Sequence, residues 1–209
     1  MEINTVLARF FYTNVYILRD EKTGKCAVID PGEASDDILD ACEEVGFENI
    51  EYIMLTHGHF DHIYGVDALL EKTGAKLVIS KEDAEMLSDD RKNASWLIGA
   101  EIKCNAQPDI LVSDGDEIKL GELTIKVMST PGHSMGSVCY FCENAIFAGD
   151  TVFCCGHGRT DLYGGSEEKI TESLIKLAAL NGDYDIYPGH DIQTTLAYER
   201  EHSPKMKMR

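Results

Sequence analysis

The sequence predicts a single domain, residues 1–209, of the α/β or α+β class, with helices covering β-sheets in a sandwich. The length suits one domain with a sizeable core, and 44% apolar with 27% charged residues is an ordinary globular balance. Short apolar runs of strand character alternate along the chain with amphipathic helical segments. Several of these runs lie close enough in sequence to pair as antiparallel hairpins, which fits a layered sandwich.

The first half of the chain is predicted to mix strands and helices. Strands are expected at 11–18 and 25–29, around the turn-rich DEKTGK, and at 52–55 and 76–80. Helices are expected from Ser35 to about Val45, from Asp61 to about Glu71, and near 81–88. Ser35 is a suitable N-cap for the first helix, and Gly46 is a suitable stop.

The second half is predicted to be richer in strands. Residues 117–129 should form a hairpin turning at Gly121, and SVCYF (137–141) and NAIFA (144–148) continue the β pattern. A helix capped by Ser166 should run to Leu180, before a last strand at 185–187. Residues 90–112 carry no clear periodicity.

Charge excludes two classes of partner. The formal net charge is −18, so the chain repels nucleic-acid phosphates and anionic lipid. No run of Lys or Arg indicates a local basic patch. We therefore expect neither a nucleic acid nor a membrane surface as a partner.

The N-terminus and the cysteines indicate a cytoplasmic protein. Glu2 precedes any Lys or Arg and no long apolar segment follows, so neither a signal peptide nor a transmembrane helix is expected. The seven cysteines are an odd number, which favours reduced thiols over a disulfide framework. Cys139 and Cys142 form a C-x-x-C within a β-like run, where positions three apart point to opposite faces, so we expect ordinary strand cysteines.

Four predicted strands end in the same way. Each gives way to a turn that bears a glycine and a side chain able to bind metal: THGHFDH (56–62), PGH (131–133), AGD (148–150) and PGH (188–190). Strand ends can converge at one edge of a sheet, where sites are often built. The candidate residues are His57, His59, Asp61, His62, His133, Asp150 and His190.

These residue types predict a metal site. Imidazoles and carboxylates held this close would repel one another, or lose hydration if buried, unless a divalent cation accepted their lone pairs. Seven ligands are too many for one tetrahedral zinc but suit two metals that share a bridging carboxylate. Zinc is the first expectation; ligands of this type suit iron and manganese as well.

The motif set resembles the metallo-β-lactamase superfamily and, within it, the glyoxalase II-like hydrolases. The resemblance runs from Asn14 and AVIDPG (27–32) through TPGHSMGS (130–137), GDTVF (149–153) and GRTDL (158–162) to YPGHD (187–191) and TTLAYEREHSP (194–204). It implies a four-layer αββα sandwich with the metals at one edge between the sheets.

The resemblance also implies a division of the ligands. His57, His59 and His133 would hold one metal, Asp61, His62 and His190 the second, and Asp150 would bridge both. Asp61 could in addition orient the attacking hydroxide or relay a proton. Asp30 and Thr56, at strand ends, could orient the ligand imidazoles.

The implied reaction is metal-dependent hydrolysis, in which an activated water attacks a thioester such as S-lactoylglutathione or a related small ester. A mononuclear iron persulfide dioxygenase and a lactonase are the alternatives. The chain is expected to be a monomer or a homodimer. The roles of Cys154, Cys155, His157 and Arg159 stay open, although Arg159 and Asp161 could form an ion pair under their loop.

Two departures from the family pattern bear on the substrate. Secreted lactamases of the superfamily usually carry a cysteine where Asp150 stands, which argues against a β-lactam. Full-length glyoxalase II enzymes continue into a helical glutathione-binding domain, whereas 19 residues, 191–209, follow His190. This leaves glutathione specificity open. Met135, where the family often has proline, is taken as tolerated variation.

Overall fold

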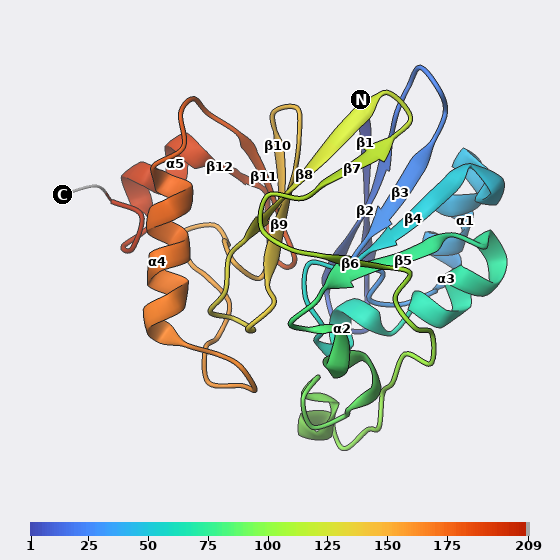
Figure 1. Ribbon diagram of the computed structural model, residues 1–209, viewed down its shortest axis with the longest axis horizontal. Helices are drawn as coiled ribbons and strands as arrows, with labels where there is room; N and C mark the ends of the chain where they lie inside the picture. Colours follow the sequence, from blue (N-terminus) through green and yellow to red (C-terminus); the bar gives the residue numbers. More distant parts are fainter. Residues whose placement is uncertain (208–209) are drawn as a thin grey trace.

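Two six-stranded sheets face each other in the computed structural model, which describes residues 1–207 (Figure 1). The first sheet has the order β1-β2-β3-β4-β5-β6, and the second β12-β11-β10-β9-β8-β7. The strands of the first sheet are β1 Glu2–Ala8, β2 Thr13–Arg19, β3 Cys26–Ile29, β4 Ile50–Met54, β5 Lys76–Ser80 and β6 Ile110–Val112. Those of the second are β7 Glu117–Leu120, β8 Leu123–Ser129, β9 Val138–Cys142, β10 Ala145–Gly149, β11 Asp185–Pro188 and β12 Thr194–Thr195.

Helices cover the outer faces of both sheets (Figure 1). On the first sheet lie α1 Asp36–Val45 and α3 Val66–Thr73, and on the second α4 Glu167–Ala178 and α5 Leu196–His202. The short α2, Phe60–Ile63, lies near the edge where the sheets meet, and 3₁₀ turns occupy Phe47–Asn49, Ala84–Ser88 and Ser95–Ile98. The predicted αββα sandwich is confirmed.

Three apolar layers hold the sandwich together. One lies between the first sheet and its helices, one between the sheets, and one between the second sheet and its helices. Cys142 belongs to the layer between the sheets and Cys139 to the outer layer. The prediction that these cysteines face opposite sides of one strand is confirmed. Successive side chains of a strand alternate between its two faces, so positions three apart point in opposite directions.

The helix expected from Asp61 to Glu71 is wrong as a single element. It is divided into α2 and α3 because the chain at Gly65 passes directly against the 31–33 turn, where the Gly65 N–H donates to Pro31 O at 2.8 Å. The predicted N-cap Ser35 has the right position, but its hydroxyl makes no capping bond. Ser166 does cap α4, accepting from the Lys169 N–H.

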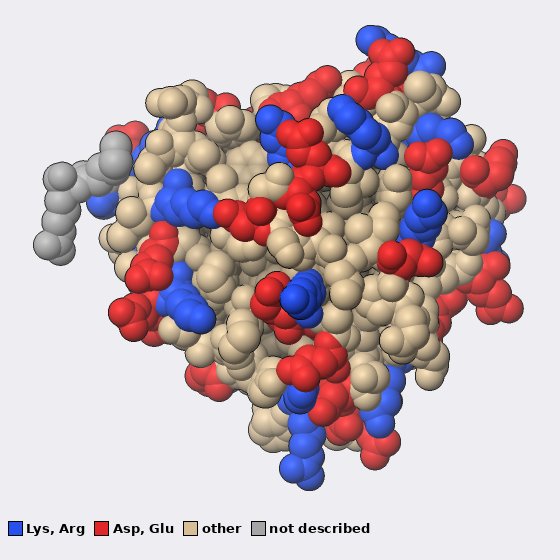
Figure 2. All heavy atoms as spheres, viewed as in Figure 1, with Lys and Arg blue, Asp and Glu red and all other residues tan. Residues whose placement is uncertain are grey.

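Other differences lie where periodicity is weak. The edge strand β1 was not expected, and the helix expected near 81–88 is a 3₁₀ turn. The segment 90–112, which shows no clear periodicity in the sequence, contains the 3₁₀ turn Ser95–Ile98 and strand β6. Among residues 1–207, no helix combines the length and apolarity that a membrane crossing requires. On the face seen in Figure 2, Lys and Arg are interspersed with Asp and Glu.

Candidate metal centre

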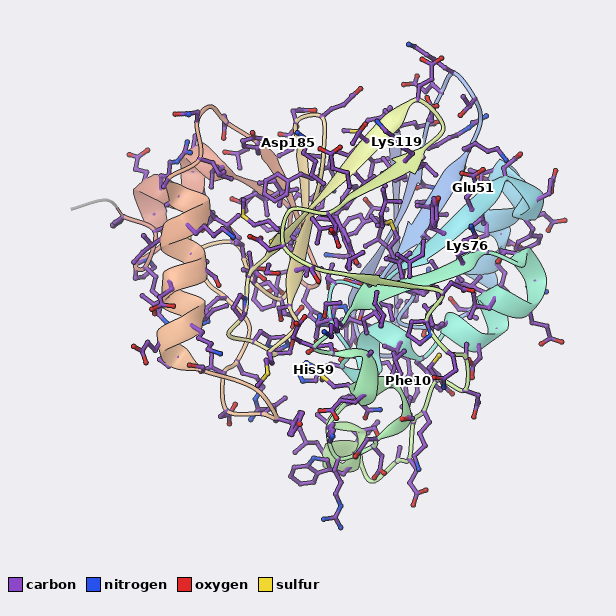
Figure 3. The ribbon with its side chains drawn as sticks, viewed as in Figure 1. Phe10, Glu51, His59, Lys76, Lys119 and Asp185 are labelled. Atoms are coloured by element: carbon purple, nitrogen blue, oxygen red, sulfur yellow. The ribbon has the colours of Figure 1, made fainter. Side chains whose placement is uncertain are left out.

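The four predicted strand ends lie at one edge between the two sheets. His57 and His59 follow β4, His133 follows β8, Asp150 follows β10 and His190 follows β11. Figure 3 shows His59 at this edge, with Glu51, Lys76, Lys119 and Asp185 toward the other end of the sheets. The strand-end pattern therefore brings together all seven residues that it singled out.

A first group consists of three buried imidazoles. His133 Nε2 lies 2.8 Å from His59 Nδ1 and 3.2 Å from His57 Nε2. All three side chains are buried. Three ring nitrogens aimed at one point can be satisfied together by a cation that accepts their lone pairs.

A second group lies beside the first, between α2 and the end of β11. His190 Nε2 lies 3.2 Å from Asp61 Oδ2, and His62 Nε2 lies 3.9 Å from the same oxygen. His62 is fully buried, whereas Asp61 and His190 are each about one-fifth exposed. The second group is therefore the more exposed of the two.

The Asp150 carboxylate stands between the groups, with one oxygen toward each. Its Oδ2 lies 3.4 Å from His133 Nε2, and its Oδ1 lies 3.4 Å from His62 Nε2 and 3.8 Å from His190 Nε2. Gly189 allows this approach, since a Cβ there would clash with Asp150 Oδ1 and lie 2.7 Å from His62 Cε1. The two groups thus share one carboxylate.

Hydrogen-bond acceptors behind three of the imidazoles fix which ring nitrogen carries the proton. His133 Nδ1 lies 2.7 Å from Arg159 O, and His190 Nδ1 lies 2.9 Å from Tyr12 O. A carbonyl oxygen can only accept, so each Nδ1 donates and each Nε2 lone pair faces the site.

Thr56 does the same for His57, and Asp30 makes an ion-pair contact with His62. Thr56 donates its N–H to Asp30 Oδ1 at 2.7 Å and its hydroxyl to Asp30 Oδ2 at 2.6 Å. Thr56 Oγ1 is therefore free to accept from His57 Nδ1 at 3.1 Å, while His62 Nδ1 lies 3.0 Å from Asp30 Oδ2. Both residues stand behind imidazoles of the site, as the sequence suggested.

Burial and neighbouring charges set the ionisation of the site. Burial, followed by repulsion from neighbouring imidazoles, lowers the pKa of His57 and brings that of His59 to about 3, so both rings are neutral. Burial acts to raise the pKa of Asp150, but His133, His62 and His190 lower it further, so it is ionised. Burial acts to lower the pKa of His62, yet Asp30, Asp61 and Asp150 raise it well above its ordinary value.

This donor set fits divalent metal ions. Both ring nitrogens of His62 and Asp150 Oδ1 are buried and make no hydrogen bond, and the lone pairs of the first group converge. Both threefold groups, His57–His59–His133 and Asp61–His62–His190, have ligand atoms within 4.8 Å of one another. A cation bound by the second group would replace the proton that Asp30, Asp61 and Asp150 otherwise hold on His62.

Asp83 is a positioning residue that the sequence did not reveal. It is fully buried and accepts from the Gly58 N–H at 3.0 Å, the Gly136 N–H at 2.7 Å and the Ser134 hydroxyl at 2.6 Å. It thereby ties the loop of His57 and His59 to the loop of His133. No glycine or histidine marks its position in KEDAE, so its sequence context carried no signal.

Replacing Asp83 with alanine should destabilise the fold by roughly 2–4 kcal/mol, since three buried donors would lose their acceptor. Chemical denaturation with an unchanged m-value would measure this loss. Ser134→Ala is the matched control, because it removes one of the three donors and leaves the other two bonds in place; about 1 kcal/mol is expected. Equal losses in the two variants would contradict the bridging role of the carboxylate.

A cavity of about 450 Å³ opens beside the two groups. Its walls are mostly apolar, from Phe60, Leu97, Ile98, Phe153 and Leu162. Arg159 also lines it, bonded to Asp161 at 2.7 and 2.8 Å. That ion pair was predicted, but its place under the loop was wrong, because both side chains are more than half exposed.

The other residues whose roles the sequence left open lie outside the two ligand groups. His157 Nδ1 contacts Gly158 O at 2.8 Å, and the Tyr163 hydroxyl donates to Glu85 at 2.7 Å. Met135 is half exposed. Cys154 and Cys155 form part of a separate cluster with Glu199.

A family model described as the metallo-beta-lactamase superfamily matches residues 8–190. The chain belongs to this superfamily. A probable metallo-hydrolase of Bacillus subtilis, YqgX, is 32% identical, covering 91% of this chain and 90% of its own length. A hydroxyacylglutathione hydrolase of Rhodospirillum rubrum is 35% identical over 85% of this chain, which spans only 61% of that longer protein. These likenesses support a hydrolase of the glyoxalase II-like kind.

Solved structures share the fold of this chain. The B3 metallo-beta-lactamase BLEG-1 superposes with a TM-score of 0.89 at 30% identity, covering 99% of this chain and 100% of that one. TTHA1623, in a di-iron-bound form, has a TM-score of 0.83 at 27% identity, covering 98% and 99%. The shared fold extends over nearly the whole chain.

Proposed function

We propose that this protein is a binuclear metal hydrolase that cleaves a small thioester. The observation that carries the proposal is the Asp150 carboxylate, which turns one oxygen to each of two threefold ligand groups. In the proposal His57, His59 and His133 hold one ion, and Asp61, His62 and His190 hold the other. Bound divalent ions would polarise a carbonyl and lower the pKa of a water.

The chain's own residues would then orient the reactants. Asp61 is partly exposed and lines the cavity, so its carboxylate can accept a hydrogen bond from the attacking water and direct it. The carbonyls of Arg159 and Tyr12 keep His133 and His190 turned toward the centre. Phe60 and Phe153 line the same cavity and exclude bulk water from one side.

The cavity favours an apolar thioester over a glutathione conjugate. Leu97, Ile98 and Leu162 offer apolar contact area, whereas a glutathione moiety presents two carboxylates. Arg159 is the lining residue with a permanent positive charge, and its guanidinium is already bonded to Asp161. A substrate with an apolar acyl chain would therefore bury more of its surface here.

Zinc is the first choice for the metal, and iron has support from the di-iron form of TTHA1623. A lactone presents the same carbonyl chemistry and stays a candidate substrate. Asp150 argues against a β-lactam, but this substrate stays in the test because BLEG-1, a metallo-beta-lactamase, has a similar length and fold. A mononuclear iron dioxygenase would leave Asp61, His62 and His190 without a metal.

Metal analysis followed by a substrate panel tests the proposal. We expect two metal ions per chain, and faster hydrolysis of thioesters with apolar acyl chains than of S-lactoylglutathione. The panel should also contain lactones and a β-lactam, as the competing ring substrates. A single iron per chain, together with oxygen uptake on glutathione persulfide, would contradict the proposal and show that the protein is a persulfide dioxygenase.

A further inference from the structure

A second cluster of potential ligands lies apart from the seven residues of the metal centre. It consists of Cys154, Cys155 and Glu199, whose Sγ atoms and carboxylate oxygen all lie within 4.8 Å of one another. The cysteines come from the loop after β10, and the glutamate comes from α5. None of these three residues belongs to the seven candidate metal ligands, and the proposed hydrolysis does not use them.

The two thiols are held at the tip of a tight hairpin. Phe153 and Gly156 exchange backbone hydrogen bonds of 2.9 and 3.1 Å, so Cys154 and Cys155 form its two-residue turn. Cys155 has φ +59, a left-handed conformation that is uncommon for a residue with a side chain. Cys155 is exposed and Cys154 is partly exposed, so both sulfurs are accessible to a ligand.

Glu199 faces this hairpin from a buried position. Its exposed fraction is 0%, and its carboxylate accepts from the Cys155 N–H at 2.9 Å and the Thr194 hydroxyl at 2.6 Å. Both partners are neutral. The neighbouring Arg200 directs its guanidinium to the carbonyls of Ala178, Leu180 and Gly182 instead. A buried carboxylate held by neutral groups is stabilised by a cation when one can reach it.

We propose that Cys154, Cys155 and Glu199 form a site for a thiophilic divalent cation of the zinc and cadmium class. Thiolate sulfur selects such ions, and a carboxylate oxygen completes a mixed sulfur and oxygen set in which water occupies the fourth position. Binding releases the two thiol protons to solvent, while the carboxylate compensates part of the charge of the ion. The site is independent of the catalytic proposal, because it shares no ligand with the metal centre.

Cadmium titration tests this site without interference from the metal centre. The ligands of that centre are nitrogen and oxygen atoms, so thiolate-to-cadmium charge-transfer absorbance can arise only from cysteines. The other five cysteines are buried. In the metal-loaded protein, kept reduced by a reductant without thiols, we expect this band to saturate at one Cd²⁺ per chain. Absence of the band would overturn the proposal.

Variants identify the three ligands. The pair Cys154→Ser and Cys155→Ser, made together, should abolish the band, and Cys26→Ala, which removes a buried thiol elsewhere, should keep it. Glu199→Gln should keep the band but lower the affinity for Cd²⁺. A band that survives the double substitution, or an affinity unchanged in Glu199→Gln, would refute the site. Circular dichroism should be unchanged in the double variant, because both side chains lie at an accessible turn.

Discussion

Asp150→Ala should lose both bound metal and hydrolytic activity, the latter by on the order of 10³-fold or more. The carboxylate turns one oxygen to His133 and the other to His62, so its removal takes a ligand from each group at once. It also removes the negative charge closest to both groups, which weakens the attraction for two dications. Metal content per chain and kcat/KM on the same protein sample would measure the effect.

The matched control is Asp185→Ala. Asp185 lies at the start of β11, toward the other end of the sheets from His59, and its side chain accepts from Asn144 at 2.8 Å (Figure 3). The control loses the same negative charge, so it separates the bridging role from a change in net charge. Full metal content and full activity in Asp150→Ala would contradict the shared-carboxylate arrangement.

The sequence was sufficient to predict that the seven candidate ligands converge, because the segments that carry them follow strands. Each of the four turns carries a glycine beside a histidine or aspartate, and strands fix where their ends lie. The fold class was predictable for a related reason, since apolar runs such as 52–55 and 76–80 became buried strands. The position of Asp30 behind an imidazole of the site was also predictable, because its carboxylate follows the end of a strand.

Most of the contacts that hold the candidate ligands in place could not be predicted from the sequence. Tyr12 and Arg159 act through backbone carbonyls, which carry no side-chain signal. Asp83 lies 25 residues from Gly58 and 53 from Gly136, and only the fold makes them neighbours. The break between α2 and α3 has the same origin, because the close passage of Gly65 against Pro31 is a tertiary contact that overrides the helical pattern.

Asp30→Asn should release most of the metal from the Asp61–His62–His190 group and lower activity by about 10- to 100-fold. The substitution keeps the size of the side chain but turns one acceptor into an NH₂ donor. Asp30 Oδ2 now accepts from the Thr56 hydroxyl and lies 3.0 Å from His62 Nδ1. An amide nitrogen there would favour the His62 tautomer with its proton on Nε2, which faces Asp150 and can no longer bind a cation.

Imidazole ¹⁵N chemical shifts of His62 in the metal-loaded protein would detect this change, because a neutral ring with its proton on Nδ1 and a ring with its proton on Nε2 differ in the shifts of both nitrogens. A general loss of stability would not produce this pattern. Thr56→Val is the matched control, because it removes the hydroxyl behind His57 but leaves Asp30 against His62. That variant should keep the His62 tautomer and the second metal. Retention of the His62 tautomer and of the second metal in Asp30→Asn would contradict this prediction. Asp30 would then act only as the acceptor of the Thr56 N–H.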